Sequence, residues 1–233
     1  MKTRKEIKTL AREALRERRG TAILLGLVYC VLTAIWTSVY TKLFLVSAAM
    51  ARRSTGILLS GTFLGTVVFV KGLAVLLVMA VLLYGAFLKL YKREDVSVEA
   101  MFTGLRPGFF RKLGGIAWMM LWLGLWSLLF VIPGVVKLFS YFAAPFILAE
   151  YPDVKAREAL TLSKRMTKGH RGQVFVMMLS FFGWGVLSVL TLGILGIVFV
   201  LPYFYLTYAG YYAELRDLAI ADGVIDPAEL GIE

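Results

Sequence analysis

The residue type best suited to acid–base chemistry at neutral pH occurs once in this chain, as His170 in the sequence Gly169-His170-Arg171-Gly172. Such a side chain can act as a general acid, a general base or a pH sensor. However, the HExxH, Walker A and GxSxG motifs are all absent. Cys30 is the single cysteine, which excludes an intrachain disulfide and a cysteine-based metal cluster. We therefore expect no catalytic residue, no metal and no cofactor, and a structural or interfacial role for His170.

The acidic residues are informative through their positions. No Asp or Glu lies inside any of the long apolar stretches, and Glu150 and Glu214 lie only at their edges. Transporters that couple to protons or cations usually keep a buried carboxylate as the coupling site. The sequence therefore disfavours ion-coupled transport through a carboxylate.

The basic residues point to anion binding. The chain has 26 Lys+Arg against 15 Asp+Glu, a formal charge of +11. The excess lies in segments between apolar stretches, so we expect anionic lipid headgroups as partners and no nucleic acid. The candidates for contact with a headgroup or a partner protein are Lys5, Lys8, Arg12, Arg16, Arg157, Lys164, Lys168, His170 and Arg171.

Aromatic residues form two stripes with helical spacing. Trp118, Trp122 and Trp126 recur every four residues, and Tyr205, Tyr208 and Tyr212 form a similar series. Each series lies on one face of a helix and could line a groove for an acyl chain or a flat apolar ligand. Stripes of this kind more often pack on neighbouring helices or face lipid, and that alternative is favoured here.

The elements that position these residues are predicted to be membrane helices. The chain of 233 residues is 59% hydrophobic, with a mean hydropathy of +0.77. Soluble domains are nearer 45–50% apolar. We predict an all-α, polytopic helical membrane protein with about six transmembrane helices arranged as three hairpins. The predicted spans lie near residues 21–41, 71–88, 113–132, 135–149, 173–192 and 195–213.

The distribution of Lys and Arg predicts the orientation. Residues 1–20 hold eight of them, and residues 89–112 and 151–172 hold six each. The positive-inside rule places all three regions in the cytoplasm, together with both chain termini. Residues 42–70 would form an outer turn, although they include Lys42, Arg52 and Arg53, which the rule disfavours there. The span 135–149 is short, and we expect it to cross as a thin span.

The N-terminal segment, residues 1–20, is predicted to be a basic amphipathic helix. Thr3 and Glu6 have the spacing of a capping box. The apolar residues Ile7, Leu10, Ala11, Ala14 and Leu15 follow the helical period. We expect this stripe to lie in a headgroup layer, the alternative being a helix packed on other parts of the protein.

The C-terminal segment, residues 214–233, reverses the sign of the charge. It contains Asp217, Asp222, Asp226, Glu229 and Glu233 against one basic residue. We predict an acidic cytoplasmic tail that folds back onto the basic loops.

Several stretches together carry a family resemblance. The second half of the chain contains LWSLLFVIPGVVKLFSYFAAPFILAEYPDVKAREAL, SKRMTKGHRGQVFVMMLSFFGWGVL and LPYFYLTYAGYYAEL, and the chain opens with RKEIKTLAREAL. These stretches resemble the bacterial integral membrane proteins grouped as domain of unknown function 975. That family is distantly similar to the membrane domain of some glycerophosphodiester phosphodiesterases. The resemblance implies a multi-pass protein of a prokaryotic cytoplasmic membrane and supplies no catalytic residues.

Three functions follow as hypotheses. The first is a non-enzymatic accessory or scaffold protein that binds lipid or a membrane partner, or forms a homo-oligomer, through its basic cytoplasmic face. The second is a small exporter or channel-like carrier of an apolar or anionic solute. The third is an enzyme acting on lipid headgroups, for which a cluster of His170 with Glu150 or Asp153 would be needed.

Overall fold

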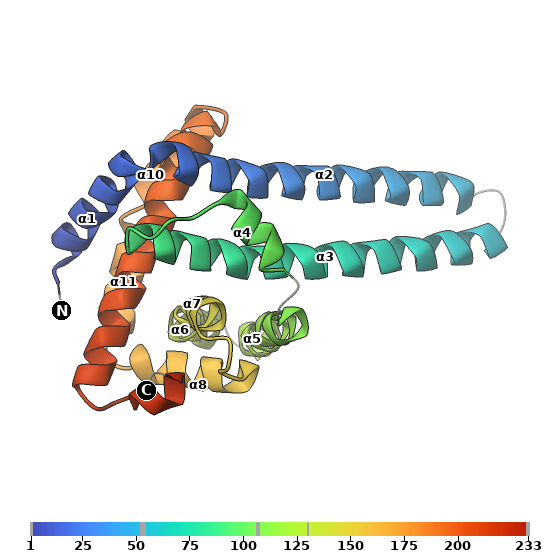
Figure 1. The fold of residues 1–233 in the computed structure, drawn as a ribbon. Helices are drawn as coiled ribbons and strands as arrows, with labels where there is room; N and C mark the ends of the chain where they lie inside the picture. Colours follow the sequence, from blue (N-terminus) through green and yellow to red (C-terminus); the bar gives the residue numbers. More distant parts are fainter. Residues whose placement is uncertain (1, 52–54, 106–107, 130, 232–233) are drawn as a thin grey trace.

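The computed structural model describes residues 2–51, 55–105, 108–129 and 131–231 (Figure 1). The prediction of an all-α fold is confirmed, because the described segments form helices joined by short turns and contain no strand. The helices are α1 (Arg4–Glu17), α2 (Arg19–Ala51), α3 (Thr55–Tyr91), α4 (Val98–Thr103), α5 (Phe109–Leu129), α6 (Val131–Ser140), α7 (Ala144–Glu150), α8 (Ala156–Met166), α9 (Arg171–Leu179), α10 (Phe182–Leu190), the π-helix η1 (Gly196–Val200), α11 (Leu201–Ala221) and the short 3₁₀ helix η2 (Pro227–Leu230).

Helices α2 and α3 form a long antiparallel hairpin that extends away from the rest of the molecule (Figure 1). They contain 33 and 37 residues, or about 50 and 55 Å of helix. Gly72 lets the arms approach, since a Cβ there would overlap the indole of Trp36. The turn predicted over residues 42–70 is wrong in its extent: helix continues to Ala51 and resumes at Thr55. That stretch contains no Pro, Asn or Asp to favour a turn. The placement of the turn on the outer side stays a prediction.

Three described segments are long and apolar enough to cross a membrane. They are Arg19–Val46, Val68–Tyr91 and Arg171–Leu190. These segments contain most of the predicted spans 21–41, 71–88 and 173–192. The six-span arrangement is therefore not confirmed and stays a prediction.

Two predicted spans are interrupted. Residues 135–149 are divided between α6 and α7, with a turn at residues 141–143. Ser163 of α8 bridges this turn: its hydroxyl donates to the Ser140 carbonyl (2.9 Å) and accepts from the Ala143 N–H (3.1 Å). Buried backbone groups freed by a helix break are stable only with such partners. Residues 173–192 are likewise divided between α9 and α10.

Helix α1 runs antiparallel along α11, and the two lie side by side in Figure 1. Lys2 pairs with Glu214 (2.6 Å), while Arg12 lies over the ring of Tyr203 (5.3 Å to its centre). The predicted capping box at the start of α1 is confirmed. Its apolar stripe contacts protein rather than a headgroup layer, because Ile7, Ala11, Ala14 and Leu15 are buried. The alternative prediction, a helix packed on other parts of the protein, therefore describes this stripe.

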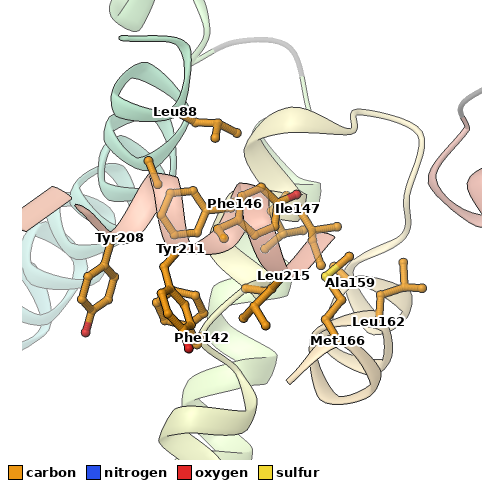
Figure 2. Close-up of a cluster of buried hydrophobic side chains, with 14 of the residues drawn as sticks. Leu88, Phe142, Phe146, Ile147, Ala159, Leu162, Met166, Tyr208, Tyr211 and Leu215 are labelled. Carbon is orange, nitrogen blue, oxygen red and sulfur yellow. The ribbon is translucent and has the colours of Figure 1, made fainter. Parts of the chain in front are cut away.

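The main core surrounds α7. Figure 2 shows Phe146 and Ile147 between Leu88 of α3 and Leu215 of α11. Phe146 stacks on Tyr212 with ring centres 4.8 Å apart. Helix α11 continues to Ala221, so part of the predicted tail is helical.

The rest of the C-terminal segment folds back onto α8, as the sequence predicts. Arg165 pairs with Glu229 at 2.8 Å and also donates a hydrogen bond to the Val224 carbonyl. Ile225 and Leu230 are buried in the main core cluster.

Candidate functional site

A partly buried ionic cluster joins three helices at one end of the core. Glu150, the last residue of α7, accepts hydrogen bonds from Lys92 after α3 (2.6 Å), and from Tyr212 (2.7 Å) and Arg216 (2.6 Å) of α11. Small residues bring these helices together. A Cβ at Gly85 of α3 would lie 2.8 Å from that of Ala149. The sequence places Glu150 at a span edge but does not predict its three partners.

The partners of Glu150 fix its charge. Burial by itself raises the pKa of this carboxyl, but hydrogen bonds from Lys92 and Tyr212 and the charge of Arg216 bring it below its ordinary value. Glu150 is therefore ionised at neutral pH and already paired with two cations. It does not cancel the charge of the other basic residues nearby.

Beside this cluster lies a recess of about 470 Å³ between the ends of α3, α5 and α7. We call it the basic recess. Its charged lining residues are Lys89, Lys92, Arg111 and Lys112, with Glu94 and Glu150.

Two of these cations are held by backbone carbonyls. Arg111 donates to the carbonyls of Leu148 (2.8 Å), Tyr151 (3.1 Å) and Val154 (2.8 Å). Lys112 donates to the carbonyl of Gly104 at 2.9 Å. Burial lowers the pKa of Lys112, and the adjacent charge of Arg111 lowers it further. An anion in the recess would relieve this repulsion, because Arg and Lys are the residues that bind phosphate and carboxylate groups.

Most of the predicted headgroup candidates lie elsewhere. Four of them stack on aromatic rings: Lys8 on Phe181 (4.6 Å), Arg12 on Tyr203 (5.3 Å), Arg157 on Trp118 (4.6 Å) and Lys164 on Tyr141 (5.4 Å). Lys5, Arg16 and Lys168 are exposed, and Arg171 is partly exposed. None of the nine lines the basic recess. The recess residues belong to 89–112, which the sequence indicates only as a region of basic charge.

His170 lies apart from the ionic cluster. Its Nδ1 is 3.3 Å from Oε1 of Gln173, and the same oxygen accepts a hydrogen bond from Tyr211 (2.9 Å). The partners of Glu150 come from α3 and α11 instead. Over the described part of the chain, no three His, Cys, Asp or Glu side chains gather as metal ligands would.

The aromatic candidates have different surroundings. Trp118 and Trp122 pack edge to face (5.9 Å), and Lys137 lies over Trp126 (4.9 Å). Tyr205 stacks on Phe87 (5.0 Å), and Tyr212 belongs to the ionic cluster.

Tyr208 lines an apolar cavity of about 190 Å³ bounded by residues of α3, α5, α6, α7, α9 and α11. Its side chain is 5% exposed, and its hydroxyl has no hydrogen-bond partner among the described residues. The tryptophan series does not line this cavity, to which α5 contributes Met119 and Leu123.

The fold is all-helical, three described segments are long and apolar enough to cross a bilayer, and cations gather at helix ends; these features are typical of helical membrane proteins. The family model described as "Protein of unknown function (DUF975)" matches residues 1–141 and 127–219. The chain therefore belongs to this family. No curated protein and no solved structure matches it, so the more distant similarity to phosphodiesterase membrane domains has no support.

Proposed function

We propose that this protein is a non-enzymatic membrane protein that binds anionic lipid headgroups in the basic recess, as an accessory or scaffold of a prokaryotic cell membrane. The observation that carries the proposal is the lining of the recess. Four cations face two carboxylates, and one of those carboxylates, Glu150, is already neutralised by Lys92 and by Arg216 outside the recess.

The orientation belongs to the same proposal. The recess lies among the ends of α3, α5 and α7, within the basic regions that the positive-inside rule assigns to the cytoplasm. A protein placed this way presents the recess to the inner leaflet, where anionic lipids are attracted by about 1 kcal/mol for each Lys or Arg.

The test measures lipid retention by native mass spectrometry from nanodiscs that mix phosphatidylglycerol with phosphatidylethanolamine. We expect the wild-type protein to retain phosphatidylglycerol preferentially. Lys89→Glu changes the recess by two charges, which corresponds to roughly 2 kcal/mol and a preference about 30-fold weaker. Lys89 is exposed in the last turns of α3, so the substitution leaves the core intact.

Lys168→Glu is the matched control, since it makes the same charge change at an exposed residue outside the recess. Equal loss in both variants would contradict a specific site. Retention of a copurified protein in place of lipid would favour a membrane partner.

A second candidate function is a carrier of a small apolar solute. The apolar cavity beside Tyr208 is the observation that favours it, because about 190 Å³ holds one ring or a short hydrocarbon. Solute release from proteoliposomes tests this candidate. Phe139→Trp, which fills the cavity from α6, should abolish release without changing the retention of phosphatidylglycerol.

A further inference from the structure

Residues 182–200, comprising α10, the turn after it and η1, form an apolar tip whose η1 arm contacts α2 and whose Trp184 and Phe199 pack against the protein core. No residue of α10 or η1 is buried, and Leu192 at the turn is 92% exposed. The exposed side chains are large and apolar: Phe182, Val186, Leu187, Val189, Leu190, Ile194 and Val198. The chain carries no Asp, Glu, Lys or Arg from Gly172 to Ala213. An exposed surface this apolar indicates contact with an apolar partner. It extends over both arms of the hairpin, α10 and η1.

The turn at the end of this tip makes its hydrogen bonds internally. The N–H of Gly193 donates to the Ser188 carbonyl (2.8 Å), and the N–H of Leu195 donates to the Thr191 hydroxyl (3.3 Å). The hydroxyls of Ser188 and Thr191 donate in turn to carbonyls of α10. A turn in water does not need this closure, whereas a turn in hydrocarbon does.

The residue types at the turn support the same environment. Leu192 has φ 52°, in the left-handed region, where a water-exposed turn normally has Gly, Asn or Asp. In water, neither the exposed apolar side chain nor the left-handed backbone of this leucine would be favourable. This residue is accounted for if the side chain is surrounded by lipid chains, where its apolar surface is removed from water.

The base of the tip is fixed by charged residues of α1. Lys8 donates to the Ser180 hydroxyl (2.6 Å) and lies over the Phe181 ring (4.6 Å), and Arg12 lies over Tyr203 on the other arm. If α11 crossed the bilayer, α1 would enter it alongside, with its exposed charges Arg4, Lys5, Glu6, Arg12 and Glu13. Each charge at the bilayer centre disfavours insertion roughly 100-fold. The level of Ser180 and Tyr203 therefore lies among water and headgroups.

The length of the tip sets an upper limit on its depth, which is reached only if α10 runs along the bilayer normal. Nine residues of α10 rise about 13.5 Å, close to half of a hydrocarbon core of about 30 Å. The preceding α9 lies on the α1 side of Ser180. It places Val174 and Met177 in the protein core and exposes Phe175, Val176 and Leu179 on its other side.

We propose that residues 182–200 insert into the hydrocarbon of the cytoplasmic leaflet and turn back near the bilayer midplane, so that this hairpin is re-entrant. The proposal rests on the cytoplasmic placement of α1 under the proposed function. The predicted spans 173–192 and 195–213 would be joined by an outer turn, which this proposal replaces with a lipid-embedded one.

The test is cysteine accessibility in a Cys30→Ser background. Single cysteines are placed at Leu192, at Val46 near the far end of α2, and at Lys168 between α8 and α9. A membrane-impermeant maleimide is applied to right-side-out and to inside-out vesicles. We expect Leu192→Cys to stay unlabelled in both and to react after detergent is added. Val46→Cys should react only from outside, and Lys168→Cys only from inside.

Labelling of Leu192→Cys from outside would overturn the proposal in favour of a full span, and labelling from inside would place the tip in water. A dimer formed at Leu192→Cys by a bifunctional maleimide would overturn lipid as the occupant in favour of a second copy of the chain. If Lys168→Cys reacted from outside, the orientation in the proposed function would fail, while protection of Leu192→Cys would still support a lipid-embedded tip. Lipid retention by Lys89→Glu is measured separately and does not affect these outcomes.

Discussion

The α2–α3 hairpin and the hairpin made of α9–α10 with η1–α11 are similar in composition and different in structure. Both contain long apolar stretches: the first contributes two described segments whose length and composition would allow them to cross a membrane, and the second contributes one. The arms of the first are helices of 33 and 37 residues that pack on each other. The first arm of the second breaks at Ser180, and its base is bound by the cations of α1. Hydropathy therefore identifies which residues need lipid, while charged neighbours in the fold limit how deep they can go.

The largest effect is expected at the ionic cluster that ties the two hairpins together. Glu150→Gln leaves the charges of Lys92 and Arg216 without their shared partner, and the side chain of Glu150 is 14% exposed. Breaking a fully buried pair costs about 3 to 5 kcal/mol, and because these pairs are only partly buried we expect the lower end of that range, about 3 kcal/mol. We expect a correspondingly lower melting temperature in nanodiscs at pH 7.

The same cluster predicts a pH dependence. Because the folded-state pKa of Glu150 is below its ordinary value, its stabilising contribution is present above about pH 4.3 and is lost as the pH falls through the folded pKa. The melting temperature of the wild-type protein should therefore fall below that pH more steeply than that of Glu150→Gln. Parallel curves would show that the cluster does not hold the hairpins together.

A carboxylate placed at the end of each hairpin tests whether the two ends lie in different environments. Leu192→Asp would place a carboxylate near the bilayer midplane, at a cost of about 3 kcal/mol. Val46→Asp would place it about 40 Å from the start of α2, beyond a core of about 30 Å, with little effect. Melting temperatures in nanodiscs distinguish them. A loss at Val46→Asp as large as at Leu192→Asp would mean that the two ends lie in the same environment.

A pair of glycines tests the packing difference. Gly72→Ala forces the indole of Trp36 away from α3, and such overpacking costs about 1 to 3 kcal/mol. Gly185→Ala adds a methyl group to α10 where nothing lies within 4 Å. It should be neutral or slightly stabilising, because Ala favours helix by about 1 kcal/mol over Gly. Chemical denaturation of the purified protein measures both, and equal destabilisation would mean that the tip is packed on protein.

The smallest effect concerns the contact that limits the depth of the second hairpin. Lys8→Gln removes the hydrogen bond to Ser180 and the charge over Phe181, an interaction of about 1 kcal/mol. Lys5→Gln removes an exposed charge from the same helix and is the matched control. We expect a lower melting temperature for Lys8→Gln alone. Equal melting temperatures for the two variants would mean that the contact with α1 does not limit how deep the second hairpin lies.

Local signals in the sequence were sufficient for some elements. The capping box at Thr3 and Glu6 and the apolar stripe after it predicted α1, because both depend on contacts within one or two helical turns. The break at residues 141–143 is not predicted by Tyr-Phe-Ala itself, but Pro145, in the first turn of α7, is a local signal for it that the predicted span 135–149 overlooks. The break is stabilised by Ser163, twenty residues away from Ala143.

The candidate site could be predicted only in part. The basic character of residues 89–112 was evident, but the recess forms only where the end of α3 meets the start of α5 and the end of α7. Likewise, the spacing of Lys8 and Arg12 indicated an anion-binding face, whereas both residues stack on rings of distant helices. Contacts between residues so far apart along the chain have no local signal in a single sequence.

The depth of residue 192 in the bilayer distinguishes a re-entrant hairpin from one that crosses the membrane or lies in water. A nitroxide on Leu192→Cys, in the Cys30→Ser background and in nanodiscs, reports its depth through the ratio of oxygen to nickel-chelate accessibility in power-saturation EPR. We expect a high ratio at residue 192, as at the bilayer centre, and a low ratio at Val46→Cys, as at an aqueous site. A low ratio at residue 192 would contradict the claim that this hairpin turns back inside the membrane.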